Sequence, residues 1–135
     1  MKTVIIVQAK MGSQRLPGKI MKNIAGFPAI NIILQRLKKT EEADKIIVAT
    51  SQNKGNKILL EYLKKIKADY FCGSEHDVVD RFYRAANKHK AKIIVRITAD
   101  CPLVDVKIVD EFIRKFKKYK PDYLSNCMPW TYPDG

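Results

Sequence analysis

Short apolar runs rich in β-branched residues alternate along this chain with longer amphipathic stretches. Because strands that alternate with helices need right-handed crossovers between parallel neighbours, this order strongly limits the fold. We expect strands at residues 4–7, 45–50, 69–72, 93–97 and 123–125, and helices at 28–37, 58–66, 74–86 and 104–119. The sequence therefore predicts an α/β fold with a three-layer, doubly wound, mostly parallel sheet. The first and fourth strands are β-branched throughout, which is typical of central strands.

Three residues mark the expected helix starts. Pro28 suits the first helical position, because its missing N–H needs no partner there. Ser74 is expected to cap the third helix, in a capping-box-like arrangement with Asp77, and Asp105 to cap the fourth. The spacing on the third helix predicts a core-facing stripe of Val78, Val79, Phe82, Tyr83 and Ala86.

Length and composition favour a single folded domain over residues 1–135. The chain has 135 residues, and 46% of them are hydrophobic. No apolar run approaches the roughly 18 residues of a membrane helix, and we find no signal-peptide cleavage site, so we expect a cytoplasmic protein without a membrane partner. The three cysteines, Cys72, Cys101 and Cys127, form no CxxC pair, which favours reduced thiols over a zinc site.

The formal net charge of +12 raises the question of nucleic acid. The lysines recur on the expected outer face of every helix and do not gather in one arm or stripe. This distribution favours a solvated surface that attracts anionic ligands, and it gives no reason to expect specific nucleic-acid binding.

The segment after the first strand reads QAKMGSQRLPGK, residues 8–19. It contains the cations Lys10, Arg15 and Lys19, with Gly12 and Ser13 between them. Glycines let the backbone approach an anion, and amide groups with Lys or Arg heads then surround it. The loop differs from a Walker A motif, which needs a different spacing and a Ser or Thr after the lysine. It predicts polyphosphate binding, with a cationic surface loop as the alternative.

A second loop, Ala99-Asp100-Cys101-Pro102, follows the fourth strand and should open onto the same edge of the sheet. Carboxylate oxygens are ligands that Mg²⁺ prefers, so Asp100 is a candidate magnesium ligand. The alternative is that Asp100 caps the following turn. On the third helix, Arg81 either pairs with Asp77 at the surface or reaches the nucleotide.

Four stretches together resemble the sugar cytidylyltransferases, and are most similar to the spore-coat polysaccharide biosynthesis branch. They are QAKMGSQRLPGK at Gln8, GSEHDVVDRFYRAA at Gly73, VRITADCPLVD at Val95 and TYPDG at Thr131. Relatives of this branch activate acidic sugars such as acylneuraminate and 3-deoxy-manno-octulosonate. The resemblance implies a nucleotide-diphospho-sugar transferase (Rossmann-like) fold, of which this chain is the N-terminal portion. The implied reaction transfers CMP from CTP to a sugar and releases pyrophosphate, for surface polysaccharide biosynthesis.

The resemblance also assigns roles to particular residues. Ala9 and its neighbours would line the base pocket, and Arg81 would help to hold the nucleotide. Asp100 would bind Mg²⁺ and act in catalysis with Arg15 and Lys19. The triphosphate would be held by Lys10, Gly12, Ser13, Arg15 and Lys19.

Two departures from the family pattern leave alternatives open. Lys10 stands where the family usually has Arg, so a bidentate contact is lost. Family members also run well beyond TYPDG, and that portion normally supplies sugar contacts, dimer contacts and a second acidic metal ligand. A non-catalytic nucleotide-binding or scaffolding domain therefore remains the alternative function. The sugar is not identified, and a homodimer remains open.

Overall fold

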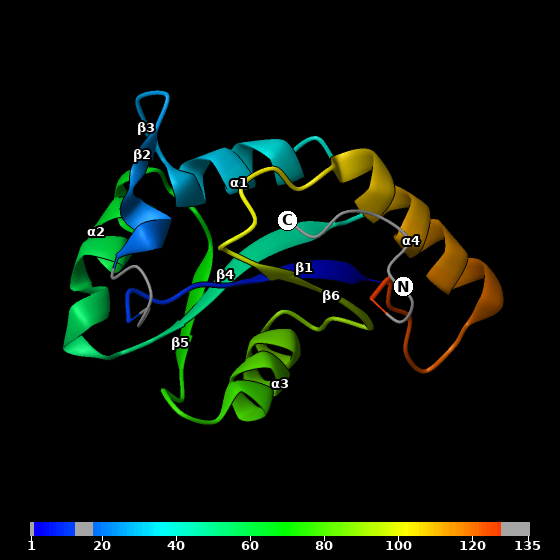
Figure 1. Ribbon diagram of the computed structural model, residues 1–135. Coiled ribbons are helices and arrows are strands. Elements are labelled where there is room, and N and C mark those ends of the chain that lie inside the picture. The colour runs from blue at the N-terminus through cyan, green and yellow to red at the C-terminus, as the bar shows by residue number, and fades with distance from the viewer. Residues whose placement is uncertain (1, 13–17, 128–135) are drawn as a thin grey trace.

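The computed structural model describes residues 2–12 and 18–127. Its main sheet has four parallel strands in the order β5 (Tyr70–Gly73), β4 (Lys45–Ser51), β1 (Thr3–Gln8) and β6 (Ile93–Thr98) (Figure 1). The four strands match the expected ones within one or two residues. The α/β fold with a parallel, doubly wound sheet is confirmed.

In the part of the chain that the structure describes, four α-helices cover the two faces of this sheet (Figure 1). One face packs against α1 (Ala29–Leu37), α2 (Lys57–Lys65) and α4 (Val106–Tyr119), and the other packs against α3 (Val78–Lys88). The side chains of β1 from Thr3 to Val7 are completely buried on both faces, because a central parallel strand is covered by helices above and below. The larger core contains Ile5, Val7, Ile30, Ile33, Leu37, Val48, Leu59, Leu63 and Ile113.

A small hairpin between β1 and α1 was not predicted. Its strands are β2 (Asn23–Ile24) and β3 (Phe27–Pro28), and it follows the 3₁₀ turn η1 (Lys19–Met21). The two residues of its turn, Ala25 and Gly26, both have positive φ, as two-residue hairpin turns favour. Alanine seldom adopts this conformation, so the Ala-Gly pair gave a weak signal. A second 3₁₀ turn, η2 (Lys54–Asn56), precedes α2.

Two expected helix starts need correction. Pro28 is the N-cap of α1 and Ala29 is the first helical residue, since Pro28 has an extended ψ of 142°. Asp77, and not Ser74, caps α3 by accepting a hydrogen bond from the Asp80 amide; the Ser74 hydroxyl accepts one from the Asp77 amide instead. Asp105 caps α4 as expected.

The expected stripe on α3 was partly wrong. Val79 is 80% exposed and Tyr83 is 64% exposed, whereas Arg81, Ala85 and Ala86 are buried. The small alanines allow α3 to lie close to the sheet, and Phe82 packs against the same core, whereas Val79 and Tyr83 face solvent. Arg81 occupies the position at which apolar spacing alone would place a hydrophobic residue.

Two strand expectations were also wrong. Residues 123–125 form no strand, and Tyr123 is 79% exposed. A run of three residues offers few ladder hydrogen bonds without a strand beside it. The fourth strand, β6, lies at the edge of the sheet among the described residues, and Ile94 is 47% exposed.

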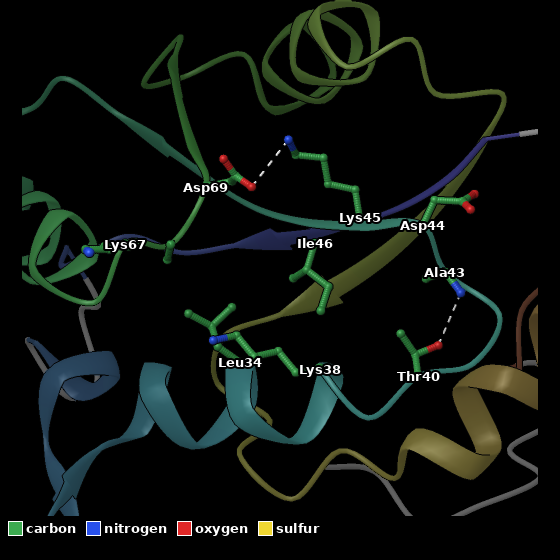
Figure 2. A pocket seen from close by; sticks show the side chains of 10 residues that line it. Leu34, Lys38, Thr40, Ala43, Asp44, Lys45, Ile46, Lys67 and Asp69 are labelled. Carbon is green, nitrogen blue, oxygen red and sulfur yellow. Dashed lines mark hydrogen bonds and ion pairs between the residues drawn. The ribbon is translucent and has the colours of Figure 1, made fainter.

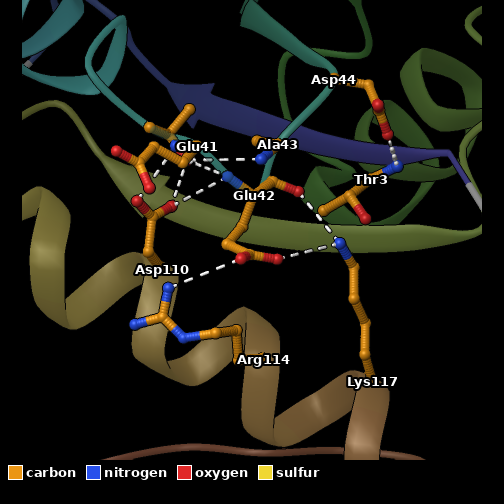
Figure 3. A network of polar contacts seen from close by, with 9 residues as sticks. Thr3, Glu41, Glu42, Ala43, Asp44, Asp110, Arg114 and Lys117 are labelled. Carbon is orange, nitrogen blue, oxygen red and sulfur yellow. Dashed lines mark hydrogen bonds and ion pairs between the residues drawn. The ribbon is translucent and has the colours of Figure 1, made fainter.

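A buried carboxylate ties α4 to the turn before β4 (Figure 3). Asp110 is 6% exposed and accepts hydrogen bonds from the Thr40 hydroxyl and from the amides of Glu41, at 3.0 Å, and Glu42, at 3.3 Å. Arg114 and Lys117 on the same helix pair with the Glu42 carboxylate at 3.5 and 3.3 Å. This network therefore holds α4 against the turn that precedes β4.

The order of the strands places a topological switch between β1 and β6. From β1 the chain continues to β4 and β5 on one side, and it then crosses to β6 on the other side. Gln8 and Thr98 are register partners, so the loops that follow β1 and β6 leave the sheet side by side. Ligands in open parallel sheets bind at this crevice. Within residues 2–12 and 18–127, every helix is too short or too polar to span a lipid bilayer.

Candidate functional site

Lys19 and Asp100 meet at this switch point, although 81 residues separate them in the sequence. The Lys19 Nζ atom lies 3.5 Å from Oδ2 of Asp100, and their side chains are 34% and 48% exposed. Lys19 comes from the turn after the first loop, and Asp100 comes from the loop after β6. The expectation that these two loops share one edge of the sheet is met by this pair.

The surroundings of Asp100 keep its carboxylate ionised. A hydrogen bond from the Thr98 side chain is the largest cause that lowers its pKa below the ordinary value, and the positive charge of Lys19 lowers it further. Partial burial acts in the opposite direction but does not reverse the shift. The edge of the sheet therefore presents a cation beside an anion that is charged at neutral pH.

The first loop has a closed neck. The Gly18 amide donates a hydrogen bond to the Met11 carbonyl at 3.0 Å, which joins the two sides of the segment between them. Gly18 has a φ of +69°, a conformation that favours glycine, and a Cβ there would lie 3.3 Å from Cε of Met11. We call Met11 and Gly18 the loop neck.

The predicted site residues Ala9, Lys10 and Gly12 differ in exposure. Ala9 is 1% exposed, and its amide donates to the Ala49 carbonyl at 3.1 Å, so the sheet hydrogen-bonding continues to the loop. Lys10 and Gly12 are exposed, and nothing lies within 4 Å of a Cβ built at Gly12. Ser13 and Arg15 lie outside the described residues, as does the TYPDG motif.

Arg81 is enclosed in this structure. The residue is 0% exposed, and its three guanidinium nitrogens have no hydrogen-bond partner among the described residues. It packs under Gly73, where a Cβ would lie 3.0 Å from Cγ of Arg81. The expected surface pair with Asp77 does not form, because the Asp77 side chain caps α3. A nucleotide contact by Arg81 would require this packing to open, and that role stays a prediction.

Asn56 is a residue of this edge that the sequence analysis did not identify. It is 2% exposed, and its Oδ1 accepts a hydrogen bond from the Met11 amide at 2.8 Å. Its Nδ2 donates to the carbonyl and the hydroxyl of Ser51 at 3.2 and 2.8 Å. The only signal in the sequence is a pair of asparagines, Asn53 and Asn56, soon after the second strand.

A cavity of about 340 Å³ lies elsewhere, at the amino end of β4 (Figure 2). Its wall includes Lys38, Lys45 and Lys67, and Lys45 pairs with Asp69 at 3.3 Å. The other residues that line it are Leu34, Thr40, Ala43, Asp44, Ile46 and Ala68. This cavity is at the opposite end of the sheet from Lys19 and Asp100, so it belongs to a different region of the molecule.

The described residues contain no group of three His, Cys, Asp or Glu side chains that could hold a metal ion by themselves. Mg²⁺ that is bound with a nucleotide usually needs fewer protein ligands, because one or two carboxylates and the phosphate oxygens share its coordination. Asp100 meets that requirement, since it is ionised, partly exposed and at the carboxyl end of a strand. The donor set thus fits magnesium carried by a polyphosphate.

The comparison with protein families gives one match that covers most of the chain. Residues 4–131 match the cytidylyltransferase family. The chain is 32% identical over 124 residues to the spore coat polysaccharide biosynthesis protein SpsF of Bacillus subtilis, an alignment that covers 89% of this chain and 52% of that protein.

Solved structures agree in fold. A cytidylyltransferase from Leptospira borgpetersenii superposes with a TM-score of 0.83 at 37% identity, over 87% of this chain and 50% of that one. A CMP:2-keto-3-deoxy-manno-octonic acid synthetase, solved in complex with CTP, superposes with a TM-score of 0.76 at 22% identity, over 87% of this chain and 48% of that one. The chain therefore spans about half the length of the relatives it matches. On the match over residues 4–131, this chain belongs to the cytidylyltransferase family.

Proposed function

We propose that this chain binds CTP with Mg²⁺ at the carboxyl ends of β1 and β6, as the nucleotide-binding part of a sugar cytidylyltransferase. The reaction transfers CMP from CTP to an acidic sugar of the 2-keto-3-deoxy or a related class and releases pyrophosphate, for surface polysaccharide biosynthesis. The observation that supports this most directly is the 3.5 Å approach of Lys19 to Asp100 at the switch point, in a chain of this family.

In this proposal the loop after β1 holds the triphosphate. Lys10, Gly12 and Lys19 contact it together with Ser13 and Arg15, and the backbone around Ala9 lines the base pocket. A sugar hydroxyl loses its proton to solvent and forms a bond to the α-phosphorus, as the bond from that phosphorus to the bridging oxygen of the β-phosphate breaks. Pyrophosphate leaves with the electron pair of that bond, so cations beside it lower the barrier.

The proposed magnesium ligand is Asp100. Bound Mg²⁺ would neutralise phosphate charge and orient the α-phosphate for attack. Asp100 is already ionised in the protein, because the Thr98 hydrogen bond and the Lys19 charge lower its pKa, so binding the cation requires no proton release near neutral pH. Lys19, now paired with Asp100, would be able to turn toward the phosphates if that carboxylate held Mg²⁺.

Calorimetric titration with CTP and Mg²⁺ tests the binding step. We expect Lys19→Ala and Asp100→Asn each to weaken binding about tenfold or more, since a hydrogen bond to a charged group contributes roughly 1.5–3 kcal/mol. Lys22→Ala and Asp122→Asn are matched controls, because both residues are exposed and each change removes the same charge. Unchanged affinity in Lys19→Ala and Asp100→Asn would defeat the assignment.

A pyrophosphate-release assay separates the two proposed functions. The catalytic proposal predicts release that depends on CTP, on Mg²⁺ and on an acidic sugar from a panel of 2-keto-3-deoxy sugars. The alternative, a non-catalytic nucleotide-binding or scaffolding domain, predicts CTP binding with no release for any sugar. Catalysis is the step that this assay tests, since the chain spans about half the length of the relatives it matches.

A further inference from the structure

We propose that Asn56 is a positioning residue that holds the loop neck in the geometry needed for triphosphate, and this inference rests on the proposed function. Asn56 touches no reacting atom in this proposal. It acts through the backbone of Met11, which it fixes relative to the carboxyl end of β4.

Both the oxygen and the nitrogen of the Asn56 side-chain amide make hydrogen bonds. The Oδ1 atom accepts from the Met11 amide at 2.8 Å, and Nδ2 donates to the Ser51 carbonyl at 3.2 Å and hydroxyl at 2.8 Å. The Ser51 hydroxyl in turn donates to the carboxylate of Glu75, in the segment between β5 and α3. Since Asn56 is 2% exposed, water cannot readily replace these bonds.

The chain of contacts continues across the neck to the candidate site. Asn56 holds the Met11 amide, and the Met11 carbonyl accepts from the Gly18 amide at 3.0 Å. The next residue, Lys19, places its ammonium 3.5 Å from Asp100. Side chains and backbone thus connect the carboxyl end of β4 to the pair at the switch point, through hydrogen bonds in which every donor has a named acceptor.

A loop that binds phosphate through backbone amides needs its ends fixed before the ligand arrives, because ordering them on binding costs conformational entropy. The neck supplies that order at Met11 and Gly18, and Asn56 anchors the Met11 side to the sheet. The base pocket around Ala9 has its own anchor, the hydrogen bond from the Ala9 amide to the Ala49 carbonyl. Losing Asn56 should therefore affect the triphosphate end of CTP more than the cytidine end.

The experiment compares Asn56→Ala with Asn53→Ala by titration with CTP and with CMP in the presence of Mg²⁺. Asn53 is a matched control because its side chain caps the amide of Gly55 at 2.8 Å in the same 3₁₀ turn and it is exposed. We expect Asn56→Ala to weaken CTP binding about tenfold and CMP binding less than threefold. Asn53→Ala should leave both affinities within twofold.

Amide hydrogen exchange without ligand tests the anchor separately. In Asn56→Ala, the Met11 and Gly18 amides should exchange at least tenfold faster, while the Ala9 amide and the central amides of β1 keep their protection. A merely structural role would instead lower the melting temperature and the protection of all these amides together, and it would weaken CTP and CMP equally.

The outcomes separate the two proposals. Wild-type protein that binds no CTP would refute the proposed function, whatever the exchange rates are. If wild-type protein binds CTP, then equal losses for CTP and CMP in Asn56→Ala would overturn the positioning role. A Met11 amide that stays protected in Asn56→Ala would also overturn it, by showing that another group holds the neck.

Discussion

Replacing Asp110 by alanine should destabilise this chain far more than removing its neighbour on the same helix. The Asp110 carboxylate is 6% exposed and accepts bonds from the Thr40 hydroxyl and from the amides of Glu41 and Glu42 (Figure 3). Alanine would leave the Thr40 hydroxyl and the Glu41 amide without this acceptor in a place that water reaches poorly, and the Glu42 amide would keep only the Thr40 Oγ1 atom, at 3.3 Å. Bonds to a charged acceptor contribute roughly 1.5–3 kcal/mol each, but desolvation of the carboxylate offsets part of the sum. We expect a net loss of about 3 kcal/mol in the free energy of unfolding.

The matched control is Glu111→Ala. It removes the same charge from the next residue of α4, where Glu111 makes a partly exposed pair with Lys115 at 2.6 Å. Solvent screens exposed pairs of this kind, so they contribute little to stability. Urea unfolding of the two variants and the wild type at neutral pH gives the comparison. A difference of less than 1 kcal/mol between the variants would refute the reasoning that buried acceptors, and not charge, hold the turn.

Three further predictions concern packing and titration. Gly73→Ala should cost about 1–3 kcal/mol in urea unfolding, because the added Cβ would lie 2.8 Å from Cε1 of Phe71 and 3.0 Å from Cγ of Arg81. A neutral effect would show that these contacts relax freely. Thr98→Val should raise the pKa of Asp100 toward its ordinary value in an NMR titration, and an unchanged pKa would contradict the assigned hydrogen bond. Because the folded pKa is lowered, the stability that Asp100 contributes is present above its ordinary pKa and is lost as pH falls through the folded one. Burial is the largest cause that lowers the pKa of His89, and nearby lysines lower it further. On acidification the unfolded chain therefore takes up this proton first, so the free energy of unfolding should fall below about pH 6.5. In His89→Gln, the free energy of unfolding should depend less on pH in this range.

Sequence patterns that depend only on which face of a strand or helix is buried predicted this fold well. The apolar runs of β1 and β4 and the spacing in α1 and α4 identified those elements within one or two residues, because burial on a sheet face or helix stripe dictates the residue types. Because the loops after parallel strands open onto one edge of the sheet, Lys19 and Asp100 could be expected at that edge. Their 3.5 Å approach confirms that step.

Features that depend on a distant partner were missed or wrong. Nothing near Asn56 in the sequence shows that it would meet Met11, 45 residues away. The buried Asp110 reads as a surface residue until the turn at Thr40 is placed beside it. The burial of Arg81 was not predicted for the same reason, because it depends on Gly73 and on the closeness of α3 to the sheet.

The position of the nucleotide is the central claim, and amide chemical-shift mapping during titration with CTP and Mg²⁺ tests it most directly. The account predicts shifts concentrated at Lys10, Gly12, Lys19 and Asp100, with little change around the lysine-lined cavity at the amino end of β4. Shifts concentrated instead at Lys38 and its neighbours in that cavity would place the ligand at the wrong end of the sheet and contradict the account.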